Sequence, residues 1–316
     1  MRLGTLLGAT LSVIAIAFVT PAVAAGKQDA KHGQKADAKS DSKKGSLTRA
    51  ERKKLEVLAR ASTKFPPNQP RVKNIRRIAD LMDGVVVEPG QSFSVNHFIG
   101  KRTEENGFVM APSILDAEMT ETVGGGISQF ATTLYNALYD AGFPVIEHKP
   151  HSHFISRYPA GVEATLSWPG PDLSFKNDSQ SPLVIETSVS KDRVSVKLLG
   201  RTPGRKVTRK APVELERKAQ TVEHIADASV SARKPKVVRE GSARRSVQVT
   251  RIVENPGKRR VDEDVVIYLP VKKILRVHPC RLPKGHKDFT GEPCGTSKKR
   301  AATKSSAKSA AKSRSH

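Results

Sequence analysis

A glycine-rich loop in the middle of the chain is the sequence feature best suited to chemistry. Gly124, Gly125 and Gly126 come directly before a helical pattern that starts near Ser128. Such a loop presents free backbone N–H groups and the positive end of a helix dipole, which suits an anion or an oxyanion. Ser128 is therefore either a residue that caps this helix or a nucleophile at its N-terminus.

Two other residues could complete a catalytic site with Ser128. His151 could act as the general base, and Asp172 could supply the carboxylate that orients it. The spacing permits this arrangement but does not demand it, because serines often cap helices and scattered histidines are seldom catalytic. The alternative is a structural turn followed by surface histidines.

The elements that must position these residues indicate an α+β fold, with helices followed by an antiparallel sheet. Thr48 and Glu51 form a capping box that predicts a short helix within residues 47–64, ending near residue 60. Apolar spacing predicts two more helices, over 72–81 and from residue 128 to a stop at 142–144. Strands are predicted at 85–87, 91–95, 151–157, 163–168, 173–176, 183–190 and 193–199.

A different organisation is expected after this domain, which spans 65–200. Residues 201–245 are polar and basic, and they read as a linker with at most a transient helix near 214–220. Residues 246–295 predict a small β module, with a hairpin around 255–257 and a possible third strand at 271–277. Cys280 and Cys294 are either two free thiols or a disulfide, which would stabilise this module by roughly 3 kcal/mol.

The ends of the chain differ sharply from the centre. The net charge of +24 lies outside residues 65–199, which carry 12 basic and 15 acidic residues. Residues 1–25 predict a cleaved secretory signal, with a retained membrane anchor as the alternative, and no later segment is apolar enough to span a membrane. Residues 26–46 and 296–316 are low-complexity basic arms predicted to be disordered, either as solvated tails or as tethers to anionic glycopolymers. No specific nucleic-acid site, cofactor or metal site is expected.

The central domain also resembles the VanW family of cell-envelope proteins. The resemblance covers roughly residues 71–200 and rests on the segments 89–96, 100–108, 123–137 and 151–152. Many members have cysteine at the position of Ser128, so the serine argues for lost or altered catalysis. Members are associated by name and gene context with the cell wall and glycopeptide antibiotic resistance. The candidate ligand-binding residues are Arg71, Asn74, Gly124, Gly125, Gly126, Gln129, Tyr135, Asn136 and His153.

Three functions follow as hypotheses for a protein secreted, periplasmic or associated with the cell wall. The first is a non-catalytic protein that binds peptidoglycan or a related wall ligand, with a possible link to vancomycin resistance. The second is an acyl-transfer or amide-hydrolysing enzyme that acts on wall peptides through Ser128, His151 and Asp172. The third is a structural or assembly factor without a small ligand.

Overall fold

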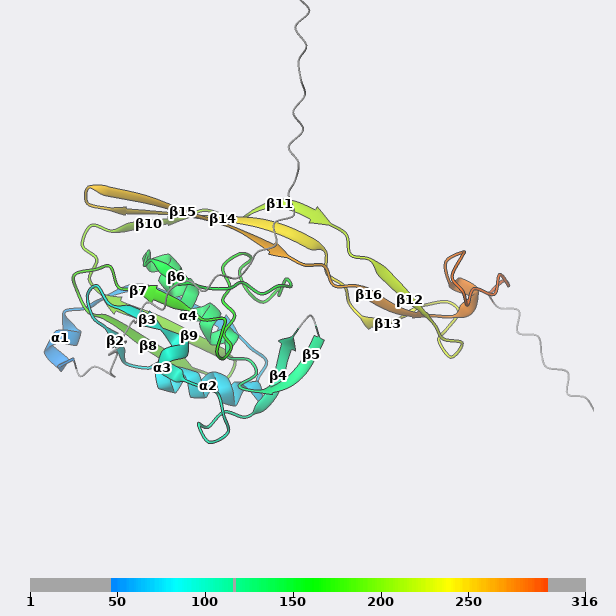
Figure 1. Cartoon of the computed structure of the whole chain (residues 1–316), viewed down its shortest axis with the longest axis horizontal. Helices are drawn as coiled ribbons and strands as arrows, with labels where there is room; N and C mark the ends of the chain where they lie inside the picture. The colour runs from blue at the N-terminus through cyan, green and yellow to red at the C-terminus, as the bar shows by residue number, and fades with distance from the viewer. Residues whose placement is uncertain (1–46, 116–117, 295–316) are drawn as a thin grey trace, which may run out of the picture. The chain divides into compact units, whose positions relative to one another are not determined.

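The computed structural model of the protein describes residues 47–115 and 118–294 (Figure 1). The predicted signal at 1–25 and the predicted basic arms at 26–46 and 296–316 lie outside the described residues. Within the described ranges, no helix is both long enough and apolar enough to cross a membrane.

An antiparallel sheet of four strands forms the base of the central domain, and helices α2 and α4 pack against it. Across the sheet the strands are β1 (Glu56–Lys64), β9 (Arg193–Gly200), β8 (Leu183–Val189) and β2 (Val85–Val87). Helix α2 (Arg71–Met82) buries Ile75, Ile78, Ala79 and Met82, which follow the predicted three-to-four-residue spacing. Helix α4 (Ser128–Ala141) is buried almost all round and ends at Gly142, which has φ 75°.

Shorter elements complete the central domain. A three-stranded sheet has the order β3 (Ser92–Ser94), β7 (Ser174–Lys176) and β6 (Val145–Glu147). The short helix α3 (Val95–Ile99) follows β3, and β4 (Met110–Leu115) pairs with β5 (Glu118–Val123) as a two-stranded ribbon. The α+β class is therefore confirmed, with more strand than helix.

Two predictions for this region are wrong. The capping box at Thr48 is present, but helix α1 covers only Arg49–Lys53, because residues 56–64 pair with β9 along their whole length. Residues 151–157 and 163–168 form no strand. They run as turns and as an extended segment, and the extended segment bonds to side chains of α4 rather than to a neighbouring strand.

The predicted linker at 201–245 is also wrong, because it contains four strands. They are β10 (Lys206–Arg209), β11 (Val213–Lys218), β12 (Val222–Ala226) and β13 (Lys236–Arg239). Strand β11 occupies the segment where a transient helix was expected, and it pairs with β14. Its residues are mostly exposed, so the sheet needs little apolar periodicity there. Ion pairs such as Arg245–Glu214 at 2.5 Å support the pairing.

The hairpin predicted after residue 245 is confirmed. Strand β14 (Arg244–Asn255) pairs with β15 (Lys258–Tyr268) around the loop at 256–257. Strand β16 (Lys273–Val277) pairs with β12 and β13 instead of joining this hairpin. A disulfide links Cys280 to Cys294, with an S–S distance of 2.11 Å.

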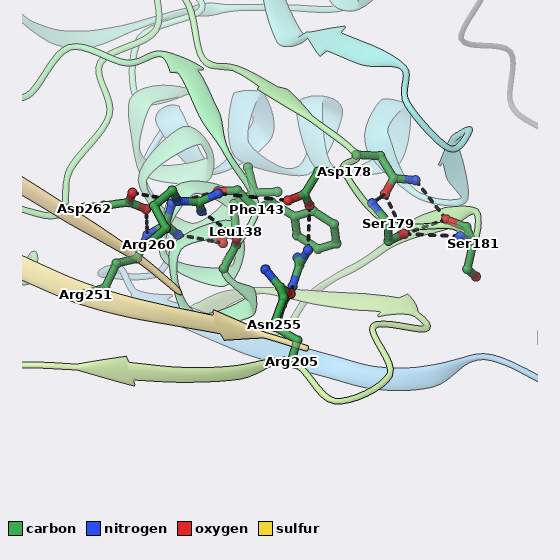
Figure 2. Close-up of polar contacts among 12 residues, drawn as sticks. Leu138, Phe143, Asp178, Ser179, Ser181, Arg205, Arg251, Asn255, Arg260 and Asp262 are labelled. Carbon is green, nitrogen blue, oxygen red and sulfur yellow. Dashed lines mark hydrogen bonds and ion pairs between the residues drawn. The ribbon is translucent and has the colours of Figure 1, made fainter. Parts of the chain in front are cut away.

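Arginine side chains join the hairpin to the C-terminal end of α4, as Figure 2 shows. Arg251 is 3% exposed and donates to the carbonyls of Leu138, Tyr139 and Phe143 at 3.2, 2.7 and 2.8 Å. Its Nε also pairs with Asp262 at 2.7 Å. Because a helix C-terminus leaves carbonyls unsatisfied and carries partial negative charge, a buried guanidinium stabilises it strongly.

Candidate ligand-binding site

Three side chains of α4, one turn apart, hold the extended segment 162–166. Ser128 Oγ accepts a hydrogen bond from the Leu166 N–H at 3.1 Å and lies 3.4 Å from the Leu166 carbonyl oxygen, to which it donates. Thr132 makes the same pair of bonds with the backbone of Ala164, accepting from its N–H and donating to its carbonyl, both at 3.2 Å. Asn136 donates to the Val162 carbonyl at 2.9 Å. Ser128 is therefore the first member of a repeated backbone clamp.

This arrangement changes the expected role of Ser128. The N-cap of α4 is Ile127, and the helix start has no side-chain capping bond, so the capping interpretation is wrong. The hydroxyl proton points to a backbone carbonyl rather than to a base. Among the residues that the structure describes, no hydrogen bond joins Ser128, His151 and Asp172 to one another.

The clamp predicts that Ser128→Ala and Thr132→Val have similar costs. Each change removes a hydroxyl with little change of shape and leaves one backbone N–H and one carbonyl without a partner. We expect the unfolding free energy to fall by about 1–2 kcal/mol in both variants, measured by urea denaturation. The clamp would be contradicted if Ser128→Ala were more stable than the wild type while Thr132→Val was destabilised. Removal of a functional side chain often stabilises a protein, so this result would indicate a functional role for Ser128.

Asp172 lies in a different network. Its carboxylate accepts hydrogen bonds from the Ser94 hydroxyl, the Asn96 N–H at 2.9 Å and the Leu173 N–H at 2.7 Å. Asn96 in turn donates to backbone carbonyls of the loop at 167–171. The role of Asp172 in this structure is to fix the start of α3 against that loop.

Instead, His151 is paired with Glu163, a residue that the sequence analysis did not select. Glu163 is fully buried, and its Oε2 lies 2.7 Å from His151 Nδ1. Its other oxygen accepts a hydrogen bond from the Tyr268 hydroxyl at 2.7 Å. A carboxylate at Nδ1 fixes the orientation of the ring and leaves Nε2 available for another partner.

Arg71 lies near His151 through Tyr158. The Tyr158 ring stacks on His151 with 5.4 Å between centroids, and its hydroxyl interacts electrostatically with Arg71. Arg71 Nη2 donates to Gln129 Oε1 at 2.6 Å, and its Nε is buried without a hydrogen-bond partner. Burial lowers the pKa of Arg71, and the neighbouring Arg157 lowers it further, while Tyr158 opposes the shift.

The glycine loop passes between two arginines, Arg102, which is buried, and Arg71, which is partly buried. A Cβ atom at Gly124 would lie 3.0 Å from Arg102 Cβ, and one at Gly126 would lie 2.8 Å from Arg71 Cβ. Both glycines also have positive φ, so this approach requires glycine. Arg102 is 7% exposed, and burial lowers its pKa to about 10. Its Nη atoms donate to neutral oxygens of Gly100 and Asn96.

The other candidate residues serve mainly the framework. Asn74 is buried and clamps Val109 and Gly125 through their backbones. Tyr135 stacks on His148 at 4.4 Å beside a separate hollow of about 430 Å³, and His153 bonds to the Leu269 carbonyl. The structure thus brings together Arg71, Gln129 and His151, with the glycine loop beside Arg71, and adds Tyr158 and Glu163 to them. No group of three or more potential metal ligands is found among the described side chains.

A second hollow, of about 670 Å³, lies at the N-terminal end of α2. Pro70, Val72 and Met110 contribute apolar surface to it. Lys73, Arg76 and Lys191 contribute positive charge, and none of the described residues that line it is a carboxylate. This end of the helix therefore combines apolar contact with positive charge, which suits an acidic ligand that also has carbon surface to bury.

The glycine loop and the residues around Arg71 lie within the part of the chain that matches known proteins. Residues 70–199 match the model of the family described as "VanW like protein". This segment is therefore a VanW-like domain. It is 40% identical over 118 residues to "Uncharacterized protein YoaR" of Bacillus subtilis (strain 168), a match that covers 37% of this chain and 39% of YoaR.

The chain thus spans about two fifths of that relative's length. Among solved structures, it is similar to the crystal structure of HP0197-G5, with 24% identity over 23% of this chain and 96% of that chain. The TM-score of 0.14 is too low to define a fold.

Proposed function

We propose that the VanW-like domain binds an acidic cell-wall ligand, the carboxylate of a peptidoglycan stem peptide above all, and catalyses no reaction on it. The observation that carries this proposal is Arg71, a partly buried guanidinium that donates to the neutral side chain of Gln129 and whose buried Nε has no hydrogen-bond partner. A buried charge is costly unless it is paired. A carboxylate would supply the missing partner, because arginine binds carboxylates with two parallel hydrogen bonds.

The surroundings of Arg71 support an acidic ligand. Arg157 adds a second positive charge near Arg71, and the three cations of the hollow at the start of α2 add more. Because His151 Nδ1 donates to the Glu163 carboxylate, the neutral ring leaves Nε2 as an acceptor for an N–H or hydroxyl group of the same ligand. Ser128 contributes to the framework and not to a reaction, because its hydroxyl is used by the backbone of Leu166.

An envelope location completes the proposal. Proteins of the VanW family are generally extracellular or associated with the cell wall, and the predicted signal of this chain fits that location. The basic arms would add electrostatic attraction to anionic glycopolymers, screened by salt. A contribution to glycopeptide resistance would follow only if the bound stem peptide is the one that the antibiotic recognises.

The experiment compares a stem peptide that ends in a free carboxylate with the same peptide ended by an amide. We expect calorimetric titration to detect binding of the free acid and at least about tenfold weaker binding of the amide, since the charge-assisted bonds to Arg71 are lost. Equal affinities would place the carboxylate outside the site. Undetectable binding of either peptide would refute a stem-peptide ligand.

Amide hydrolysis or acyl transfer is the second candidate function. It is favoured by the Glu163–His151 pair, because a buried carboxylate at Nδ1 is how many enzymes orient a basic imidazole. Asp172 does not take that part, since it bonds to Ser94, Asn96 and Leu173. Product formation from a wall peptide that disappears in His151→Ala and Ser128→Ala would support this alternative.

A further inference from the structure

Strand β15 has one edge without a neighbouring strand. Strand β14 lies beside β10 and β11 on one side and beside β15 on the other, and β15 pairs with no other strand among those described. The residues along this edge are accessible, with Arg259 side chain 59% and Val261 46% exposed. A free edge of this length can add a further strand through its backbone groups.

The charges along the edge change sign at Val261, so the strand is complementary in charge to an antiparallel copy of itself. Residues 258–264 read Lys-Arg-Arg-Val-Asp-Glu-Asp, with three cations before Val261 and three anions after it. If two copies of this strand pair antiparallel around Val261, every cation meets an anion. The cross-strand pairs are Lys258 with Asp264, Arg259 with Glu263, and Arg260 with Asp262, each occurring twice.

The backbone geometry permits this register. The hairpin closes with a two-residue loop on the pair Asn255–Lys258. In an antiparallel ladder, residue pairs that exchange backbone hydrogen bonds alternate with pairs that do not. Counting from Lys258, the N–H and C=O groups of every second residue of β15 therefore point toward β14. Those of Arg259, Val261 and Glu263 point toward the free edge. These three residues are the ones that face their partners when Val261 lies on the two-fold axis.

We propose that two copies of this chain associate through the free edges of β15, antiparallel and with Val261 on the axis. A second copy fits this edge better than a strand of uniform charge, which would meet three like charges in either orientation. Charged side chains on an edge strand usually prevent it from pairing with another strand. Here the order of the charges disfavours other sequences but is complementary to a second copy of β15. The closed two-fold pairing leaves no free β15 edge, so the assembly stops at a dimer.

The contacts of Arg259 and Glu263 within one chain do not prevent the exchange, whereas Arg260 and Asp262 keep their bond to each other, and Asp262 its bond to Arg251, within the chain. Arg259 lies 3.9 Å from Glu254, and Glu263 bonds to Gln248 and Thr250, all at the exposed surface. Exposed ion pairs of this kind contribute little stability. The dimer is expected to be weak, because a short strand pair buries little area. On a surface where chains are concentrated, it would double the number of ligand sites per particle and raise avidity.

A charge exchange tests the register by sedimentation of the purified chain over a concentration series. Arg259→Glu and Glu263→Arg should each weaken dimerisation at least tenfold, because each places like charges opposite one another twice. The double variant should restore it to within about threefold of the wild type, and high salt should reduce the difference between the variants. Lys236→Glu, the same charge change on exposed β13, is the matched control and should not affect dimerisation.

Cysteine cross-linking tests the axis independently. In the proposed register, a cysteine at Val261 faces its own copy, whereas one at Val265, equally exposed at 46%, faces Gly257. Mild oxidation should link Val261→Cys into a covalent dimer much faster than Val265→Cys, and the native cysteines are already paired. A monomeric wild type throughout the series, a dimer unaffected by Arg259→Glu, or equal linking at both positions would each overturn the proposal. None of these results bears on ligand binding at Arg71.

Discussion

Replacement of Arg251 by methionine is expected to lower the free energy of unfolding by about 3–5 kcal/mol, the range for removing one partner from a buried ion pair. The substitution removes a charged donor from three carbonyls at the end of α4 and from the Asp262 carboxylate, which keeps its bond to Arg260. It also removes the cation 4.6 Å from the Tyr139 ring centroid. Methionine keeps much of the apolar side-chain stem, so the loss should report the polar contacts.

Arg260→Met is the matched control for this prediction. Arg260 is on the neighbouring strand and also contacts Asp262 and a carbonyl near the end of α4, but its side chain is 30% exposed. We expect a loss of about 1 kcal/mol or less, because partly exposed ion pairs contribute little. Denaturant unfolding followed by circular dichroism measures both variants. Equal losses in the two would show that burial of Arg251 does not determine its contribution.

Arg71→Gln is expected to weaken binding of the acidic wall ligand about 100-fold, which corresponds to about 2.7 kcal/mol. The change removes the charge that the ligand would neutralise, but an amide can still donate to Gln129. Because the wild-type guanidinium is partly buried and has no anionic partner among the described residues, the unfolding free energy should change by less than about 1 kcal/mol. Affinity and stability therefore respond very differently at this position.

Arg76→Gln provides the comparison for Arg71 on the same helix. The Arg76 guanidinium donates to the carbonyls of Val189 and Ser190 and is exposed to solvent. Its replacement should reduce affinity by no more than about tenfold through loss of long-range attraction. A loss of affinity at Arg76 as large as that at Arg71 would indicate binding by general positive charge rather than at a defined site.

The sequence predicts the elements whose signals are local. The spacing of Val72, Ile75, Ile78 and Leu81 predicts α2, and the glycines on either side of residues 128–141 bound α4. The same holds for the hairpin around 256–257. Each signal lies within a few residues of the feature that it specifies.

The errors arise where partners come from distant parts of the chain. Residues 162–166 have the composition of a strand, but their backbone groups bond to Ser128, Thr132 and Asn136 on a helix. Residues 201–245 form strands that are largely solvated, so their polar composition resembles a linker. Composition and periodicity carry no information about these partners.

The site shows the same division. The glycine loop could be selected from the sequence and Arg71 and Gln129 from the family resemblance, but Glu163, Tyr158 and Arg102 could not. Glu163 is a single acid in an apolar stretch, and its importance depends on burial beside His151, 12 residues away. Asp172 was a reasonable candidate by residue type, yet its hydrogen bonds commit it to α3.

Mass spectrometry of a wall stem peptide incubated with the wild-type chain at equal concentration tests the central claim most directly, namely that this domain binds its ligand without transforming it. We predict that the peptide is recovered at its original mass after prolonged incubation and that the protein carries no covalent adduct. A shortened or transferred peptide, or an acyl adduct on Ser128, would contradict the account and establish an enzyme.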